Sequence, residues 1–323
     1  MQPKKPLIEA RGLTKKYEVR AGAGFGKREI RAVDSLDLKI YPGEVFGLVG
    51  ESGCGKTTAG HLLAGLLPPS GGEVAYAGAS TCGMRAAELR RMRREVQVVF
   101  QDPYAALNPK KTVGWMVEEP LKIHFQYGRA ARCRKVVETL ASVGLDESFL
   151  SRYPGELSGG QRQRVSIAAA LMLEAKMLVT DEAVSALDVS IQAQILNLLK
   201  DLQRDRNLTY LFISHDLNVV QYMSDRIGVM YLGRLVECGG VEDVYTDPRH
   251  PYTRALLSSI LLPAEERGPR ISLTGEVPSL LSLPTGCAFH PRCPHMRENC
   301  LKERPGLREL SPGHFAACLH ADW

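Results

Sequence analysis

The sequence lacks any run of about 18 apolar residues, so we expect no helix that spans a membrane. Its beginning, MQPKKPLIEARGLTKKY, also lacks the apolar core of about 7–15 residues that a secretory signal peptide requires. Both absences favour a protein of the cytosol, where thiols stay reduced. No two cysteines stand in the close C-x₂₋₄-C pairing that is typical of zinc sites.

The composition that is present is typical of a globular protein. The 323 residues are enough for one large domain with an appendage or for two domains, and 44% of them are hydrophobic. The formal net charge of +5 permits contact with anionic ligands but is too small to indicate nucleic-acid binding. The basic run RRMRRE has no interleaved aromatic residues, so we interpret it as a solvated helix face and expect no nucleic-acid partner.

Two apolar runs of strand length, KMLVTDE and LTYLFISHD, each end in polar residues. This pattern is typical of buried parallel strands with a site at their carboxyl ends, and it predicts an α/β fold. Residues 7–49 indicate short strands, and residues 112–150 have helical periodicity. Further on, the sequence becomes rich in Pro, Gly and Cys, so we predict a domain boundary near 245–265.

The stretch GESGCGKT, from Gly50 to Thr57, fits the phosphate-loop pattern G-x-x-x-x-G-K-[ST] between an apolar strand and a helix. Its glycines allow backbone N–H groups to turn toward phosphate oxygens, and the helix start adds partial positive charge. Lys56 is suited to reach the β- and γ-phosphates, and the Thr57 hydroxyl is suited to ligate Mg²⁺. The loop residues that we predict to bind ATP are Gly50, Glu51, Ser52, Gly53, Cys54, Gly55, Lys56, Thr57 and Thr58.

An acidic pair at the end of KMLVTDE complements this loop. Asp181 is suited to hold Mg²⁺ through water, and Glu182 to orient or deprotonate the attacking water. Acidic residues are also common at helix starts, but a phosphate loop upstream makes the catalytic interpretation the stronger one.

The stretch LSGGQRQR, from Leu157 to Arg164, contains a second helix start suited to anion binding. With it the sequence resembles the ATP-binding subunit of an ABC transporter over roughly residues 7–245. Other motifs of that family follow in order: Tyr17 resembles the residue that stacks on adenine, Gln101 the Q-loop glutamine, Ser185–Asp188 the D-loop, and His215 the switch histidine. Ala183 departs from the family pattern, which has Pro after the catalytic Glu, so we expect a less rigid loop with hydrolysis retained.

The resemblance implies a RecA-like P-loop nucleotide-binding domain over residues 1–245, with an antiparallel β subdomain and a helical subdomain at about 102–157. It implies that two such domains pair head to tail. ATP would then lie between the phosphate loop of one domain and Ser158, Gly159, Gly160 and Gln161 of the other. By the same resemblance Glu182, His215 and Gln101 act in catalysis, while Thr57, Gln101 and Asp181 hold Mg²⁺.

The segment RHPYTRALLSSI, from Arg249 to Ile260, and the later TGEVPSLLSLPTGCAFHPRCP resemble the end of the dipeptide, oligopeptide and nickel importer subgroup. The resemblance implies an ATPase at the cytoplasmic face of the membrane that works with two transmembrane permease subunits and an extracytoplasmic solute-binding protein. It also implies a second, different ATPase chain, although the motifs permit a homodimer. A soluble ABC ATPase of ribosome or DNA maintenance is the alternative, and the substrate is left open among dipeptides, oligopeptides and nickel chelates.

Half of the eight cysteines gather in residues 246–323, a predicted Cys-rich C-terminal extension, at Cys287, Cys293, Cys300 and Cys318. Their spacing is C-x₅-C-x₆-C-x₁₇-C, with turn-forming prolines and a glycine nearby that allow the thiolates to converge. Zinc and a four-iron, four-sulfur cluster both accept four thiolates. The wide spacing, and the resemblance to importers of which some members have an iron–sulfur cluster, favour the cluster. Zinc ranks second and two disulfides third, with free thiols as the remaining alternative.

Overall fold

The computed structural model describes residues 5–20, 27–260, 271, 273 and 275–321. The chain divides into two compact units. The first unit contains Met1–Ile40, Val45–Cys82 and Ser214–Trp323, and the second contains Tyr41–Glu44 and Gly83–Ile213. Residues 246–323 therefore fall within the first unit, and the boundary near residue 245 stays a prediction.

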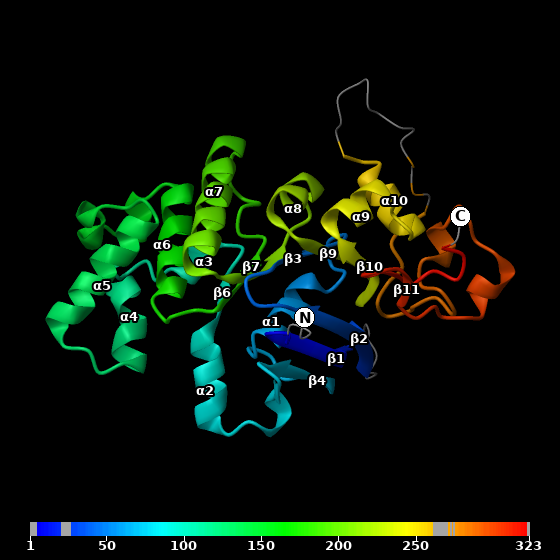
Figure 1. Ribbon diagram of the computed structural model, residues 1–323, viewed down its shortest axis with the longest axis horizontal. Helices are drawn as coiled ribbons and strands as arrows, with labels where there is room; N and C mark the ends of the chain where they lie inside the picture. Colours follow the sequence, from blue (N-terminus) through cyan, green and yellow to red (C-terminus); the bar gives the residue numbers. More distant parts are fainter. Residues whose placement is uncertain (1–4, 21–26, 261–270, 272, 274, 322–323) are drawn as a thin grey trace. The chain divides into compact units, whose positions relative to one another are not determined.

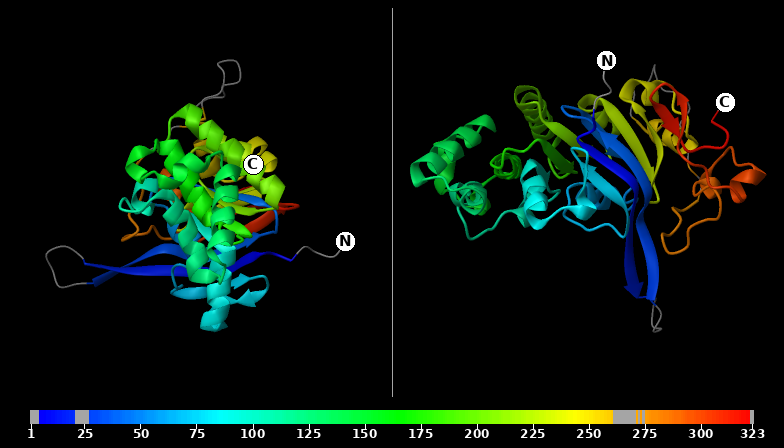
Figure 2. Two further views of the ribbon diagram at one scale, coloured as in Figure 1. Left: turned by 90° about the vertical axis from the view of Figure 1, so that its left-hand side faces the viewer. Right: turned by 60° about the horizontal axis from the view of Figure 1, so that its bottom comes forward.

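The first unit contains a four-stranded antiparallel sheet. Its strands are β1 (Ile8–Arg20), β2 (Lys27–Ile40), β4 (Gly71–Tyr76) and β5 (Ala79–Ser80), in the order β2-β1-β4-β5. Figure 2 shows β1 and β2 as a long two-stranded ribbon. Buried and exposed residues alternate in β2 from Ser35 to Ile40, which places Leu36, Leu38 and Ile40 in the core. The predicted antiparallel β subdomain is confirmed.

A second sheet of the first unit carries the phosphate loop and the C-terminal strands. The strands are β3 (Val45–Val49), β9 (Arg226–Tyr231), β10 (Arg234–Gly240), β11 (Arg308–Ser311) and β12 (His314–Ala316), in the order β11-β12-β10-β9-β3. Strands β3 and β9 are parallel, and the other pairs are antiparallel. The helices of this unit are α1 (Lys56–Leu63), α8 (Leu217–Met223), α9 (Val241–Thr246) and α10 (Pro251–Leu257).

The second unit is built on three parallel strands with helices around them. The strands β6 (Val96–Val99), β7 (Met177–Asp181) and β8 (Thr209–Ile213) pair in the order β6-β7-β8. Every residue of β7 and β8 is buried, as the two apolar runs of the sequence predict. The helices are α2 (Ala86–Glu95), α3 (Pro103–Ala106), α4 (Val113–His124), α5 (Arg129–Ser142), α6 (Gly159–Leu171) and α7 (Val189–Arg206).

The range predicted for the helical subdomain, 102–157, contains α3, α4 and α5. In Figure 1, α4 and α5 lie together at one end of the second unit. Among the residues that the structure describes, no helix combines the length and the apolar character needed to cross a membrane.

A buried hydrogen bond between two side chains joins the C-terminal strands to β10 in the first unit. Glu237 on β10 is 0% exposed, and its Oε1 lies 2.8 Å from Nε2 of His314 on β12. The same carboxylate accepts hydrogen bonds from the backbone N–H groups of Arg249, at 2.7 Å, and His250, at 2.8 Å. One buried carboxylate therefore holds both the C-terminal hairpin and the approach to α10 against the sheet.

Replacing this carboxylate tests its contribution to stability. Glu237→Ala leaves two buried backbone donors and the imidazole of His314 without their acceptor. Because each buried donor left without its acceptor costs about 1–3 kcal/mol, the free energy of unfolding should fall by about 3–5 kcal/mol. Urea unfolding followed by circular dichroism measures this loss.

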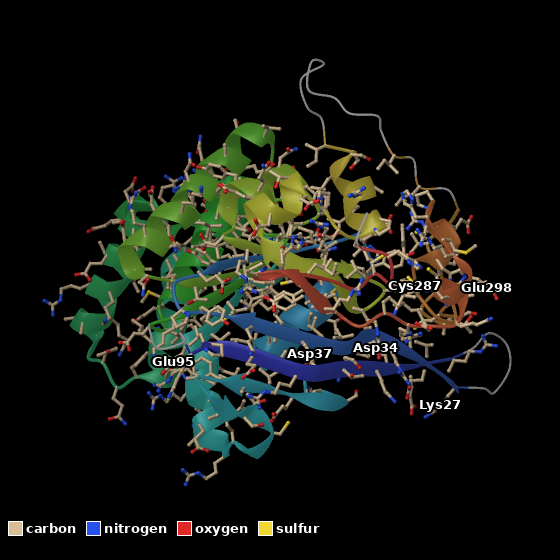
Figure 3. All side chains as sticks on the ribbon, turned by 45° about the vertical axis from the view of Figure 1, so that its right-hand side comes forward. Lys27, Asp34, Asp37, Glu95, Cys287 and Glu298 are labelled. Atoms are coloured by element: carbon tan, nitrogen blue, oxygen red, sulfur yellow. The ribbon has the colours of Figure 1, made fainter. Side chains whose placement is uncertain are left out.

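The exposed pair between Glu298 and Lys302, 3.0 Å apart, provides the control (Figure 3 labels Glu298). Water solvates both partners there, so Glu298→Gln should leave the unfolding midpoint unchanged. A Glu237→Ala variant as stable as the Glu298→Gln variant would contradict the anchoring role of Glu237.

Candidate functional site

The phosphate loop joins β3 to α1 in the first unit, and two of its glycines leave no room for a side chain. Gly50 has φ +150° and Gly55 has φ +104°. A Cβ atom at Gly50 would lie 2.2 Å from the carbonyl oxygen of Met230, and one at Gly55 would lie 2.1 Å from that of Ala32. The backbone therefore passes closer to its neighbours than any other residue type allows.

Lys56 is the first residue of α1 and is buried. Its Nζ donates hydrogen bonds to the carbonyl oxygens of Gly50, at 2.8 Å, and Glu51, at 3.1 Å. No side chain caps this helix start, which suits a helix that binds an anion at its first turn. The ammonium group is thus held within the loop, where it would bind phosphate together with the loop backbone.

The remaining residues of the predicted loop differ in their exposure. Ser52 and Thr57 are exposed, and Thr58 is half-buried. Cys54 is buried, and burial raises the pKa of its thiol, so the sulfur is neutral at physiological pH. Its carbonyl oxygen accepts a hydrogen bond from the N–H of Gly233, in the turn between β9 and β10, at 2.8 Å. The β9–β10 hairpin therefore supports the loop through the backbone.

In the second unit the structure brings together two predicted catalytic residues. The side-chain N–H of Gln101, which follows β6, donates to Oε2 of Glu182, which follows β7, at 3.0 Å. Asp181, the last residue of β7, is buried. Because β6 and β7 are neighbouring parallel strands, their carboxyl ends meet at one edge of the sheet and place these side chains in contact.

Glu182 has a left-handed backbone, with φ +47°, which is unfavourable for a residue other than glycine. Its N–H donates to the carbonyl oxygen of Ile213 at 3.0 Å, and its carbonyl oxygen accepts from the Ser185 hydroxyl at 2.9 Å. The next residue, Ala183, is 4% exposed. These contacts hold the strained residue in place.

The four residues Ser158, Gly159, Gly160 and Gln161 form the start of α6 in the second unit. The Ser158 hydroxyl accepts from the N–H of Gln161 at 3.3 Å, and the Gln161 side-chain oxygen accepts from the N–H of Ser158 at 2.9 Å. A Cβ atom at Gly160 would lie 2.4 Å from Cγ2 of Ile191 on α7. Close packing against α7 therefore requires this glycine, while Ser158 is exposed.

The other predicted site residues belong to three different elements or their approaches. His215 is exposed, in the first unit, and directly precedes Asp216, which caps α8 by accepting from the N–H of Asn218 at 2.9 Å. Tyr17 lies on β1 and is 36% exposed. Asp188, the last residue of the predicted D-loop, caps α7, and its hydrogen bonds to Ile191 and Ser190 lower its pKa. The proposed roles of these three residues stay predictions.

The four C-terminal cysteines line a single small cavity, although the sequence separates them widely. The other residues around it are His250, Pro251, Phe289, His290, His295, Leu319 and His320. Burial raises the pKa of the Cys287 and Cys318 thiols, and that of Cys293 to about 11, so neutral thiols are favoured. All four are free cysteines, which does not support the disulfide alternative.

The geometry of these thiols does not support the predicted metal site. Across the described part of the chain, no group of three or more His, Cys, Asp or Glu side chains is arranged to hold a metal ion. The structure therefore shows convergence of the four cysteines on one cavity, but it supports neither the expected iron–sulfur cluster nor zinc.

Sequence reasoning missed two residues that contact the phosphate loop. The guanidinium group of Arg292 donates to both carboxylate oxygens of Glu51, at 2.8 and 3.0 Å. The hydroxyl of Tyr252 accepts from the N–H of Glu51 at 2.9 Å. Both residues lie in the segments that resemble the importer subgroup, but nothing in those segments indicates a contact with the loop.

Comparison with known proteins now identifies the chain. A family model described as "ABC transporter" matches residues 33–185, and one described as "Oligopeptide/dipeptide transporter, C-terminal region" matches residues 236–300. Among solved structures, the dimeric ATP-binding cassette MJ0796 bound to ADP and phosphate is similar, with a TM-score of 0.64 and 30% identity. That match covers 72% of this chain and 98% of the other. The chain is therefore an ABC-transporter ATPase.

Similarity to curated proteins extends over nearly the whole chain. The oligopeptide transport ATP-binding protein AppF of Bacillus subtilis is 47% identical over 319 residues, which cover 97% of this chain and 96% of AppF. The dipeptide transport ATP-binding protein DppF of Haemophilus influenzae is 45% identical over 318 residues, which cover 98% of this chain and 97% of DppF. The chain belongs to the family of ATP-binding subunits of oligopeptide and dipeptide ABC transporters.

Proposed function

We propose that this chain powers the import of dipeptides or oligopeptides across the cytoplasmic membrane through partner subunits. The observation that carries the proposal is the combination of a complete ABC motif set with a C-terminal region that matches the oligopeptide/dipeptide type at residues 236–300. Relatives that are similar over nearly the whole chain are named for oligopeptide or dipeptide transport. They favour peptides over nickel chelates and transport over ribosome or DNA maintenance.

Each motif has a role in the proposed hydrolysis of ATP. Lys56 and the loop backbone bind the β- and γ-phosphates. Glu182 accepts a proton from water as the water oxygen attacks the γ-phosphorus and the bond to the β-phosphate oxygen breaks. The hydrogen bond from Gln101 orients the carboxylate of Glu182 for this step. His215 would contact the γ-phosphate, and Tyr17 would stack on adenine.

A Mg²⁺ ion would neutralise phosphate charge during this reaction. Thr57 offers an exposed hydroxyl, Asp181 a carboxylate at the end of a buried strand, and Gln101 an amide oxygen. These are the oxygen donors that Mg²⁺ prefers, so the residues fit the ion chemically.

The exposed start of α6 is suited to a second ATPase subunit. An anion-binding helix start that faces solvent can complete a nucleotide site only on another molecule. We therefore propose head-to-tail pairing with a second, different ATPase chain. The pair would act from the cytoplasmic face on two transmembrane permease subunits, with an extracytoplasmic solute-binding protein delivering the peptide.

We further propose that the four C-terminal cysteines hold a four-iron, four-sulfur cluster, with zinc as the second choice. The proposal rests on donor chemistry alone, because all four cysteines line one cavity and iron and zinc both bind thiolates, whereas the described side chains are not arranged as metal ligands. The raised pKa values mean that metal binding would have to release the thiol protons. Metal ligation would also contribute folding free energy to a segment that is poor in regular structure.

The choice between transport and a soluble role is tested by isolating the chain under mild detergent from its own host. Transport predicts that two polytopic membrane proteins and a second ATPase chain co-purify with it, identified by mass spectrometry. Co-purification with ribosomes or DNA repair proteins instead would reject the transport proposal. Two copies of this chain alone with the membrane proteins would reject the heterodimer.

The role of Glu182 is tested by Glu182→Gln. Loss of the general base should lower the ATP hydrolysis rate by about 10²–10⁴-fold while the dissociation constant for ATP stays unchanged. Phosphate release and equilibrium binding of a fluorescent ATP analogue measure the two quantities. Glu174→Gln, an exposed acid in the same unit, is the matched control and should hydrolyse ATP normally. Normal turnover by Glu182→Gln would overturn the assignment.

The metal proposal is tested by anaerobic purification with iron, sulfide and zinc analysis. A cluster predicts about four irons and four sulfides per chain with visible absorption, lost in Cys300→Ser and retained in the exposed control Cys82→Ser. Equimolar zinc without that absorption would select the second choice. A chain with neither metal, and equal stability with and without chelator, would reject both.

A further inference from the structure

The phosphate loop is held from outside at one residue, Glu51, through both its side chain and its backbone. Arg292 donates two nearly parallel hydrogen bonds to the carboxylate, from Nη1 to Oε2 at 2.8 Å and from Nη2 to Oε1 at 3.0 Å. The Tyr252 hydroxyl accepts from the Glu51 N–H at 2.9 Å. Paired charge-assisted bonds of this kind fix orientation as well as distance.

Both contacting side chains are themselves rigidly placed. Tyr252 is fully buried, and its ring packs against the rings of Tyr231 and Phe289, with centroids 4.6 and 5.5 Å away. Arg292 is 7% exposed, and its backbone N–H donates to the carbonyl oxygen of Phe289 at 3.0 Å. The carboxylate of Glu51 raises the pKa of Arg292 further above its ordinary value, so the guanidinium stays charged.

Fixing Glu51 also fixes the acceptors of the phosphate-binding lysine. Lys56 Nζ donates hydrogen bonds to the carbonyl oxygens of Gly50 and Glu51. The loop itself is rich in glycine, and glycine loses more conformational freedom on ordering than any other residue. An anchor at Glu51 therefore supplies order that the sequence of the loop does not.

We propose that Arg292 is a positioning residue for ATP binding, which acts through Glu51 and is supported by Tyr252. Its effect is on the shape of the phosphate loop before ATP arrives, so it should change affinity more than the chemical step. The C-terminal region thereby contributes directly to the nucleotide site of its own chain. This inference rests on the proposed ATP site at the phosphate loop.

The competing explanation is that the pair merely fastens the C-terminal segment to the rest of the first unit. A second ion pair allows these two explanations to be distinguished. Arg304, from the same segment, lies 3.4 Å from Asp34 of β2, and Figure 3 labels Asp34 and Cys287 in this part of the molecule. Arg304→Gln therefore removes a fastening contact of the C-terminal segment without touching the phosphate loop.

The test compares ATP dissociation constants, KM and kcat for variants of the full-length chain. Arg292→Gln should weaken ATP binding and raise KM by about ten- to a hundredfold, the effect of losing charge-assisted hydrogen bonds, with kcat nearly unchanged. Arg292→Lys keeps the charge without the fork geometry and should be intermediate. Tyr252→Phe preserves the aromatic packing and should give a smaller loss, which keeps the test valid if Arg292→Gln folds poorly.

The decisive measurement is the ATP affinity of a double variant, which reports whether Arg292 and Glu51 act together. Because Arg292 acts through Glu51, the double variant Glu51→Gln, Arg292→Gln should bind ATP no more weakly than the worse single variant. Arg304→Gln should keep the ATP affinity of the unaltered chain. Fully additive losses, an unchanged affinity in Arg292→Gln, or an equal loss in Arg304→Gln would each overturn the inference. Failure of the unaltered chain to bind ATP would instead contradict the proposed function.

Discussion

The first unit depends on the close approach of backbone to backbone at Gly50 and Gly55. The carbonyl oxygens of Met230 and Ala32 occupy the space that a Cβ atom would need at these two glycines. Strand β3, the β9–β10 hairpin and β2 therefore meet at the phosphate loop, and the left-handed turns of the loop direct the chain into α1 at Lys56. A side chain at either position would separate these elements and displace Lys56.

The edge of the second unit where β6 and β7 end differs, because it contains a strained residue other than glycine. Glu182 keeps its left-handed backbone through a hydrogen bond to the strand β8 and another to Ser185. The family pattern would place Pro after this residue, whereas this chain has Ala183, which is buried. Burial and hydrogen bonding can therefore restrain the turn that a proline would otherwise stiffen. The contact with Gln101 then fixes the direction of the carboxylate.

Motifs with local causes could be predicted from the sequence, and contacts between distant segments could not. Glycine spacing, a lysine and a helix start already define a phosphate loop, and an apolar run that ends in Asp181 and Glu182 places this acidic pair at the carboxyl end of a strand. By contrast, Arg292 and Glu51 are 241 positions apart. No periodicity or spacing connects them, because the pairing follows from how α10 and the C-terminal segment pack around Tyr231 and Phe289.

The cysteines show the same difference between what local sequence predicts and what only distant packing decides. Sequence alone determined that this chain carries a complete set of ABC motifs and four clustered thiols in a segment of the importer type. Only the tertiary structure decided that those cysteines line one cavity, that burial raises the pKa of Cys287, Cys293 and Cys318, and that the neighbouring Arg292 reaches the phosphate loop. The physical reason is that local motifs are specified by the backbone needs of a few adjacent residues, whereas burial and distant ion pairs exist only after the core has packed.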